Sequence, residues 1–161
     1  MSGHRYFEDW RPGEEIGLGR WQVTAAEIKA FAAEFDPQPF HLDEAAAAES
    51  IFGGLVASGW HTCAMLMRLI ADTPALMGAN IVSPGFDDLA WPVPVRPGDV
   101  LEGHARVVDK RPSASKPDRG LVRFDYSMVN RNGETALRLR SLVLYRRRPA
   151  ATLAAAGGGA E

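Results

Sequence analysis

The chain has 161 residues, 46% hydrophobic and 24% charged, so it can bury one ordinary core but has no room for a second full domain. The formal net charge is -2 and the basic residues are scattered except for Arg146, Arg147 and Arg148, which argues against a nucleic acid partner. No apolar stretch approaches the roughly 20 residues that a bilayer span needs, and the N-terminal segment lacks a signal-peptide core. We therefore expect neither membrane insertion nor export.

The sequence contains one cysteine, Cys63, which lies among apolar residues. An internal disulfide framework is thereby excluded, and a reducing compartment is the simpler assumption, so we expect a cytoplasmic location. Residues 1–148 are predicted to form a single domain. Residues 149–161 are rich in alanine and glycine and are expected to be a flexible tail, because they cannot bury enough surface to offset ordering.

Residues near the N-terminus predict a short strand over 16–23, followed by a helix that runs to about Phe35. Thr24 and Glu27 have the spacing of a capping box, in which a hydroxyl and a carboxylate bind free amides at a helix start. The next residues, Asp-Pro-Gln-Pro at 36–39, cannot continue a helix, because each proline lacks an amide donor and pushes its predecessor toward extended geometry. This segment is predicted to be a rigid turn.

Helix-forming residues resume at 43–49, and a glycine-containing loop at 51–57 leads into an apolar helix predicted over 59–71 and closed by Pro74.

Strand signals dominate from Phe86 onward, with strands predicted over 99–111, 120–131 and 134–147. Asn132-Gly133 indicates a tight hairpin between the last two, since both residue types tolerate positive φ. The order of elements favours an α+β fold, in which a curved antiparallel sheet wraps one long central helix.

Asp36 and His41 lie five positions apart on a segment that Pro37 and Pro39 stiffen. Adding water to an activated double bond requires a base for the water proton and an acid for the α carbon, both fixed around one small volume. A carboxylate can bind and polarise the water, and an imidazole can donate from one nitrogen while it accepts at the other. A purely structural role remains the alternative: Asp36 caps the chain while His41 packs on the next helix.

The segment 54–61 supplies a second chemical group, because it immediately precedes the apolar helix. The amides of Ser58, Gly59 and Trp60 are expected at the partly positive helix start, where an oxyanion is stabilised. Negative charge builds on the oxygen of a thioester when water adds to its β carbon, and preorganised amides act there. Gly59 is the best candidate donor, since it lets a carbonyl approach the backbone closely; packing of the helix is the alternative reason for this glycine.

These two segments together resemble the MaoC-like dehydratases and R-specific enoyl-CoA hydratases. The family's signature is an Asp-x-Asn-Pro-aliphatic-His run, followed after a helix by a glycine-containing oxyanion turn; Asp36, Pro39 and His41, then Gly59, match it. The segment Trp-Pro-Val-Pro-Val-Arg-Pro-Gly-Asp at 91–99 also looks like a turn of that family. The resemblance spans about residues 8–147.

The resemblance implies a hot-dog fold, a homodimer with joined sheets or a higher homo-oligomer, and an acyl-CoA thioester substrate. It also implies reversible hydration of a trans-2-enoyl-CoA by Asp36 and His41, with Gly59 as the oxyanion donor. Gln38 stands where the signature has asparagine and is one methylene longer, so its contact with the water or with His41 is expected to differ. Met67 stands where some hydratases carry a serine.

Substrate contacts are further expected from Gln38, Ser58, Trp60 and His61, although a structural role for His61 is slightly favoured. No spacing of histidine, cysteine and carboxylate residues indicates a metal site, and no cofactor is expected. The phosphates of coenzyme A would need basic side chains, and the sequence does not choose among the available ones, Arg68, Arg96, Lys116 and Arg119.

Two other functions remain open at this point. A hot-dog acyl-CoA thioesterase uses the same fold, because fold does not fix function. A non-catalytic acyl-thioester-binding module is the third reading. The Asp36 and His41 pair favours hydration over hydrolysis, since hydrolysis needs no second group to protonate carbon.

Overall fold

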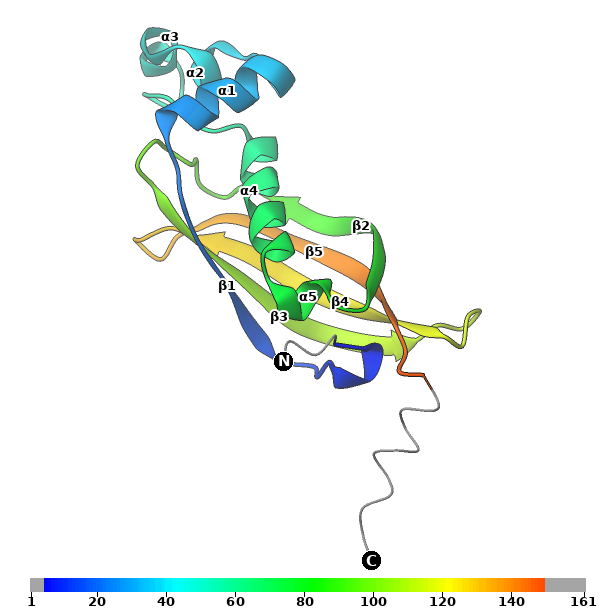
Figure 1. Cartoon of the computed structure of the whole chain (residues 1–161). Helices are drawn as coiled ribbons and strands as arrows, with labels where there is room; N and C mark the ends of the chain where they lie inside the picture. Colours follow the sequence, from blue (N-terminus) through cyan, green and yellow to red (C-terminus); the bar gives the residue numbers. More distant parts are fainter. Residues whose placement is uncertain (1–4, 150–161) are drawn as a thin grey trace, which may run out of the picture.

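A five-stranded antiparallel sheet dominates residues 5–149, the part of the chain that the computed structural model describes (Figure 1). The strand order is β1-β3-β4-β5-β2, so β1 and β2 form the two edges. The strands are β1 (Glu15–Gln22), β2 (Asn80–Ala90), β3 (Val100–Pro112), β4 (Arg119–Val129) and β5 (Thr135–Arg146). The predicted α+β class is confirmed, whereas the predicted tail lies almost wholly outside the described residues.

The helices fall into two groups (Figure 1). One group lies beyond one end of the sheet, and the other, led by the long helix α4, lies against the sheet. The first group contains α1 (Ala25–Phe35), α2 (Pro39–Leu42) and α3 (Glu44–Glu49); the second contains α4 (Gly59–Ala71) and α5 (Pro74–Met77), and a 3-10 turn, η1 (Phe7–Asp9), precedes β1. No helix within residues 5–149 has both the length and the apolar character to span a bilayer.

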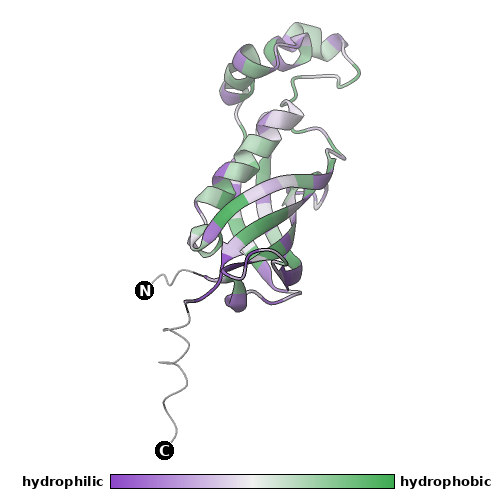
Figure 2. Ribbon diagram, turned by 90° about the vertical axis from the view of Figure 1, so that its right-hand side faces the viewer, coloured by the Kyte–Doolittle hydropathy of each residue, from purple (hydrophilic) through white to green (hydrophobic). Residues whose placement is uncertain are grey.

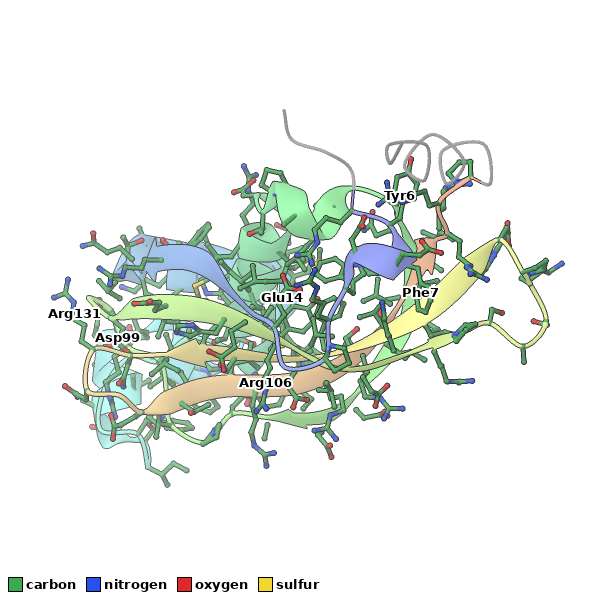
Figure 3. All side chains as sticks on the ribbon, turned by 90° about the horizontal axis from the view of Figure 1, so that it is seen from below. Tyr6, Phe7, Glu14, Asp99, Arg106 and Arg131 are labelled. Carbon is green, nitrogen blue, oxygen red and sulfur yellow. The ribbon has the colours of Figure 1, made fainter. Side chains whose placement is uncertain are left out.

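The core forms between α4 and one face of the sheet. Alternate residues of β4 point toward the helix and are buried, as period-2 geometry requires: Val122, Phe124, Tyr126 and Met128. Figure 2 shows hydrophobic residues, in green, along the central helix and the strands beside it. The buried residues of α4 include Met65, Leu66 and Leu69. Arg106 of β3 is exposed and points away from α4, whereas Phe7 of η1 packs against Gly120 of β4 (Figure 3).

The predicted capping box at Thr24 forms only in part. The Thr24 hydroxyl accepts from the Glu27 amide at 3.2 Å, as expected. The Glu27 carboxylate instead accepts hydrogen bonds from the Thr24 hydroxyl at 2.9 Å and from the Trp21 indole at 2.6 Å. Glu27 therefore ties the start of α1 to the last residues of β1.

Three local expectations need correction. Pro74 begins α5 rather than simply ending a helix, because a proline at the first helical position loses no hydrogen bond. No strand is predicted over residues 80–90, yet β2 forms there; most of its residues are exposed, so alternation is absent from the sequence. In the β4–β5 turn only Gly133 takes a positive φ, +79°, while Asn132 donates its amide to the Asn130 side chain.

Candidate active site

The segment that carries Asp36 and His41 is folded by its two prolines. Asp36 ends α1, and its amide donates to the Ala32 carbonyl at 3.0 Å. Pro39 then starts α2, a one-turn helix, at a position where its missing N–H costs no hydrogen bond. The predicted rigid turn thus includes a helical turn that brings the His41 side chain back toward Asp36.

The His41 imidazole lies between a carboxylate and a backbone carbonyl. Its Nε2 is 3.4 Å from Asp36 Oδ2, and its Nδ1 is 2.6 Å from the Val56 oxygen. Because a carbonyl only accepts, Nδ1 must carry a proton, and the neutral ring therefore has its lone pair on Nε2, facing Asp36. The residue is only 5% exposed, so packing holds the ring in this orientation.

Both oxygens of the Asp36 carboxylate accept hydrogen bonds. The Ser58 hydroxyl donates to Oδ2 at 2.6 Å, and the Gln38 amide donates to Oδ1 at 2.8 Å. The Ser58 bond, then the Gln38 bond, lower the pKa of Asp36 below its ordinary value; desolvation opposes them, and His41 adds a smaller lowering. Asp36 is therefore ionised at neutral pH.

Gly59 is the first residue of α4, and Ser58 is its N-cap. The Gly59 amide has no carbonyl partner within the helix, as at every helix start. A Cβ on Gly59 would lie 2.6 to 2.9 Å from three ring carbons of Trp91. This contact supports the packing alternative for this glycine and identifies the partner, because the Trp91 ring packs directly on its backbone.

One cavity of about 440 Å³ brings most of these groups together. Of the seven residues selected from the sequence, six line it: Asp36, Gln38, His41, Ser58, Gly59 and Trp60. Its remaining wall comes largely from the loop before β3, which contains Trp91, Pro92, Val93, Pro94 and Val95. The Ala57 amide donates to the Val95 carbonyl at 2.8 Å and joins that loop to the segment before α4.

His61 is not among the residues that line this cavity. Its ring stacks on Phe31 of α1, with centroids 4.8 Å apart, and its Nε2 lies 3.8 Å from Glu27 Oε1. Its Nδ1 is buried without a hydrogen-bond partner in the described structure. Burial lowers the pKa of His61, and Glu27 opposes that shift only in part. His61 therefore packs α4 against α1, in line with the structural role that the sequence slightly favours.

Trp91 is the largest of the cavity residues that the sequence did not indicate. Its ring lies against Gly59 and makes an edge-on contact with Trp60, with centroids 5.5 Å apart. From the sequence, the segment 91–99 is expected only to form a turn. The one available signal was a large aromatic residue directly before a proline-rich loop, which does not by itself indicate a cavity wall.

Comparison with known proteins assigns the chain to a family. The family model described as "MaoC like domain" matches residues 9–125. The chain belongs to the MaoC-like domain family. A crystal structure described as a MaoC-like dehydratase, from Rhodospirillum rubrum, is 47% identical, with a TM-score of 0.84 over 90% of this chain and 99% of that one.

Two further relatives extend the comparison. The 3-hydroxyacyl-thioester dehydratase Z of Mycobacterium tuberculosis is 31% identical over 60% of this chain and 66% of its own length. The Mycobacterium tuberculosis protein RV0216, described as having a double hot-dog fold, has a TM-score of 0.80 over 92% of this chain and 46% of that chain, at 17% identity. The MaoC-like resemblance and the hot-dog fold expected from the sequence are confirmed.

Proposed function

We propose that this MaoC-like protein is a hydro-lyase that reversibly adds water to a trans-2-enoyl-CoA and gives a 3-hydroxyacyl-CoA. One observation carries the proposal: Asp36 Oδ2 and His41 Nε2 are 3.4 Å apart on the wall of a cavity that Gly59, at the start of α4, also lines. The family membership and the name of the mycobacterial dehydratase support the same reaction class.

Asp36 and His41 bind and activate the water in this proposal. Two acceptors, an ionised carboxylate and the Nε2 lone pair, face each other, so one water can donate a proton to each. As the water oxygen bonds to the β carbon, Nε2 takes one of its protons. Asp36 stays ionised and stabilises the imidazolium, as does the Val56 carbonyl at Nδ1.

The second half of the reaction protonates the α carbon. Electrons from the double bond move to the thioester oxygen, where the Gly59 amide stabilises the negative charge. The imidazolium then returns the proton from Nε2 to the α carbon. The hydroxyl group and the hydrogen both arrive from the same side, so the addition is syn, and the reverse sequence dehydrates a 3-hydroxyacyl thioester.

Gly59→Ala is expected to lower kcat at least about tenfold, because a misplacement of about 1 Å at a catalytic donor is costly. The new Cβ and the Trp91 ring cannot both keep their positions, so the helix start or the ring must shift. Initial rates with crotonyl-CoA measure the effect. Gly17→Ala is the matched control, since nothing lies within 4 Å of a Cβ there; equal rates in both variants would place the donor elsewhere.

A second cavity lies on the other side of Trp60. It has a volume of about 390 Å³, and its wall is mainly apolar, with Met67 and Ile70 of α4 and Phe86 of β2. Trp60 is the residue that the two cavities share. The acyl group of the substrate is directed toward this apolar space in our proposal, and the Trp60 ring limits how far it extends.

Trp60→Ala is therefore expected to shift selectivity toward longer acyl chains. Each buried methylene contributes about 0.8 kcal/mol, so access for two more raises the kcat/KM ratio of octenoyl-CoA to crotonyl-CoA roughly tenfold. Competition assays with both thioesters measure that ratio. Phe35→Ala, which removes an exposed aromatic ring that lines neither cavity, is the control. An unchanged ratio in Trp60→Ala would contradict the role of this ring.

Assembly and coenzyme A binding complete the proposal. The edge strand β2 exposes Val82 and Phe86, each 53% accessible, which supports a homodimer in which two β2 edges join. Arg96 is the best placed of the four basic residues for a phosphate of coenzyme A, because its guanidinium donates at 2.6 Å to the carbonyl of Phe52, on the cavity wall.

The reaction is tested by following an enoyl-CoA at its conjugation band together with a thiol reagent. Loss of absorbance without free thiol is the expected result. Release of thiol would indicate a thioesterase instead, and no change in either signal would favour a non-catalytic thioester-binding module.

A further inference from the structure

The Ser58 side chain connects the start of α4 to the Asp36 carboxylate. Ser58 is only 1% exposed. Its hydroxyl accepts a hydrogen bond from the Trp60 amide at 3.2 Å and donates its proton to Asp36 Oδ2 at 2.6 Å. The hydroxyl thus acts as an acceptor for the helix and as a donor to the candidate catalytic group.

Within residues 5–149, two other N-cap side chains that bind helix amides, Thr24 and Asp43, act locally. The Thr24 hydroxyl accepts from the Glu27 amide and donates to the Glu27 carboxylate, three residues away. Asp43 accepts from the Ala46 amide, also three residues away. Ser58 differs because its donor bond reaches a residue 22 positions earlier in the chain. Capping of the helix requires only the acceptor, so the donor bond calls for a separate explanation.

We propose that Ser58 is a positioning residue that holds the Asp36 carboxylate ionised and turned toward His41. The inference rests on the proposed hydration reaction and adds a specific role within it. Oδ2 is the oxygen that receives the Ser58 proton and also the one nearest to His41 Nε2. Gln38 holds only Oδ1, and it does so from an exposed position where water competes for the same bond.

Loss of the Ser58 hydroxyl has two consequences for Asp36. The carboxylate can rotate about its Cβ–Cγ bond, because the exposed Gln38 bond alone remains. Its charged form also loses its strongest hydrogen bond, so the pKa of Asp36 rises toward its ordinary value. Since the reaction needs Asp36 ionised, activity then fails at a higher pH on the acid side.

The test measures kcat and KM for crotonyl-CoA as functions of pH in Ser58→Gly. Glycine is accepted as an N-cap with a loss of only a few tenths of a kcal/mol, so this variant removes the hydroxyl and keeps the helix. We expect kcat at neutral pH to fall about tenfold, the usual order for a hydrogen bond to a charged group, with KM within about twofold. The acid limb of the kcat profile is expected to move to higher pH in Ser58→Gly. Ser58→Thr keeps a hydroxyl, so its acid limb is expected at the wild-type pH.

Thr24→Ala is the matched control, because it removes an N-cap hydroxyl that does not contact Asp36. It is expected to lower the melting temperature while leaving the pH profile unchanged. If Ser58→Gly has the same kcat and the same acid limb as the wild type, the proposal is overturned and Ser58 is a helix cap only.

A direct titration separates this inference from the proposed reaction. Carboxyl carbon NMR of Asp36 is expected to give a higher pKa in Ser58→Gly than in the wild type, whether or not hydration is observed. If the wild type hydrates no enoyl thioester, the proposed reaction fails, while the titration still decides whether Ser58 holds the Asp36 charge. An unchanged Asp36 pKa would overturn the role of Ser58 on its own.

Discussion

Asp36→Asn is expected to lower kcat for hydration of crotonyl-CoA by about 100-fold or more, the range for loss of one preorganised group that stabilises charge in the transition state. Asparagine keeps the shape of the side chain and can still accept from Ser58, but it carries no negative charge. The water then loses one acceptor, and the imidazolium that forms on His41 loses its stabilising partner 3.4 Å away. Initial rates against substrate concentration measure the loss, which should appear in kcat rather than in KM.

Asp43→Asn provides the control for this variant. Asp43 is the N-cap of α3, and asparagine caps a helix as well as aspartate does. The same chemical change two residues past His41 is therefore expected to leave kcat unaltered. Turnover within about twofold of wild type in Asp36→Asn would remove Asp36 from the reaction.

His41→Ala is the second large effect, and a loss of about 100-fold or more in kcat is again expected. The change removes Nε2, which takes the water proton and returns it to carbon. It also leaves the Val56 carbonyl without its 2.6 Å partner, so some stability is lost as well. Added imidazole, which fits the vacated space, is expected to recover part of the turnover.

His61→Ala distinguishes lost chemistry from lost packing. The two histidines are similarly buried, at 5% and 7% exposed, but only His41 lines the candidate cavity. His61→Ala is expected to lower the melting temperature because the stack on Phe31 is lost, while kcat of the folded enzyme changes little. Equal losses of kcat in both variants would mean that His41 acts through packing alone.

The features that could be predicted from the sequence were those set by neighbouring residues. Pro37 and Pro39 cannot lie in the interior of a helix without breaking it, and alternation along β4 requires one buried face, so both features could be predicted. The edge strand β2 was not among the predicted strands, because its residues are mostly exposed and show no period. The strand order depends on pairings between distant segments, which no local pattern encodes.

The same distinction applies to the candidate site. Asp36 and His41 could be selected because they share one short stiff segment. The Ser58 hydroxyl bond and the Trp91 contact with Gly59 join residues 22 and 32 positions apart, so they emerge only when the chain is folded. His61 was selected because it follows Gly59 closely, but two helical positions turn a side chain by about 200°, which sends it to another face of α4.

In the proposed reaction, Asp36 and His41 add water across the double bond of an enoyl thioester. It is tested most directly by incubating crotonyl-CoA with the protein in deuterated, ¹⁸O-enriched water and analysing the product by NMR and mass spectrometry. We expect one deuterium on the α carbon, one solvent oxygen on the β carbon and no free thiol, with the rate of labelling about 100-fold or more lower in Asp36→Asn and in His41→Ala. Free coenzyme A without a hydroxylated product, or undiminished labelling in both variants, would contradict it.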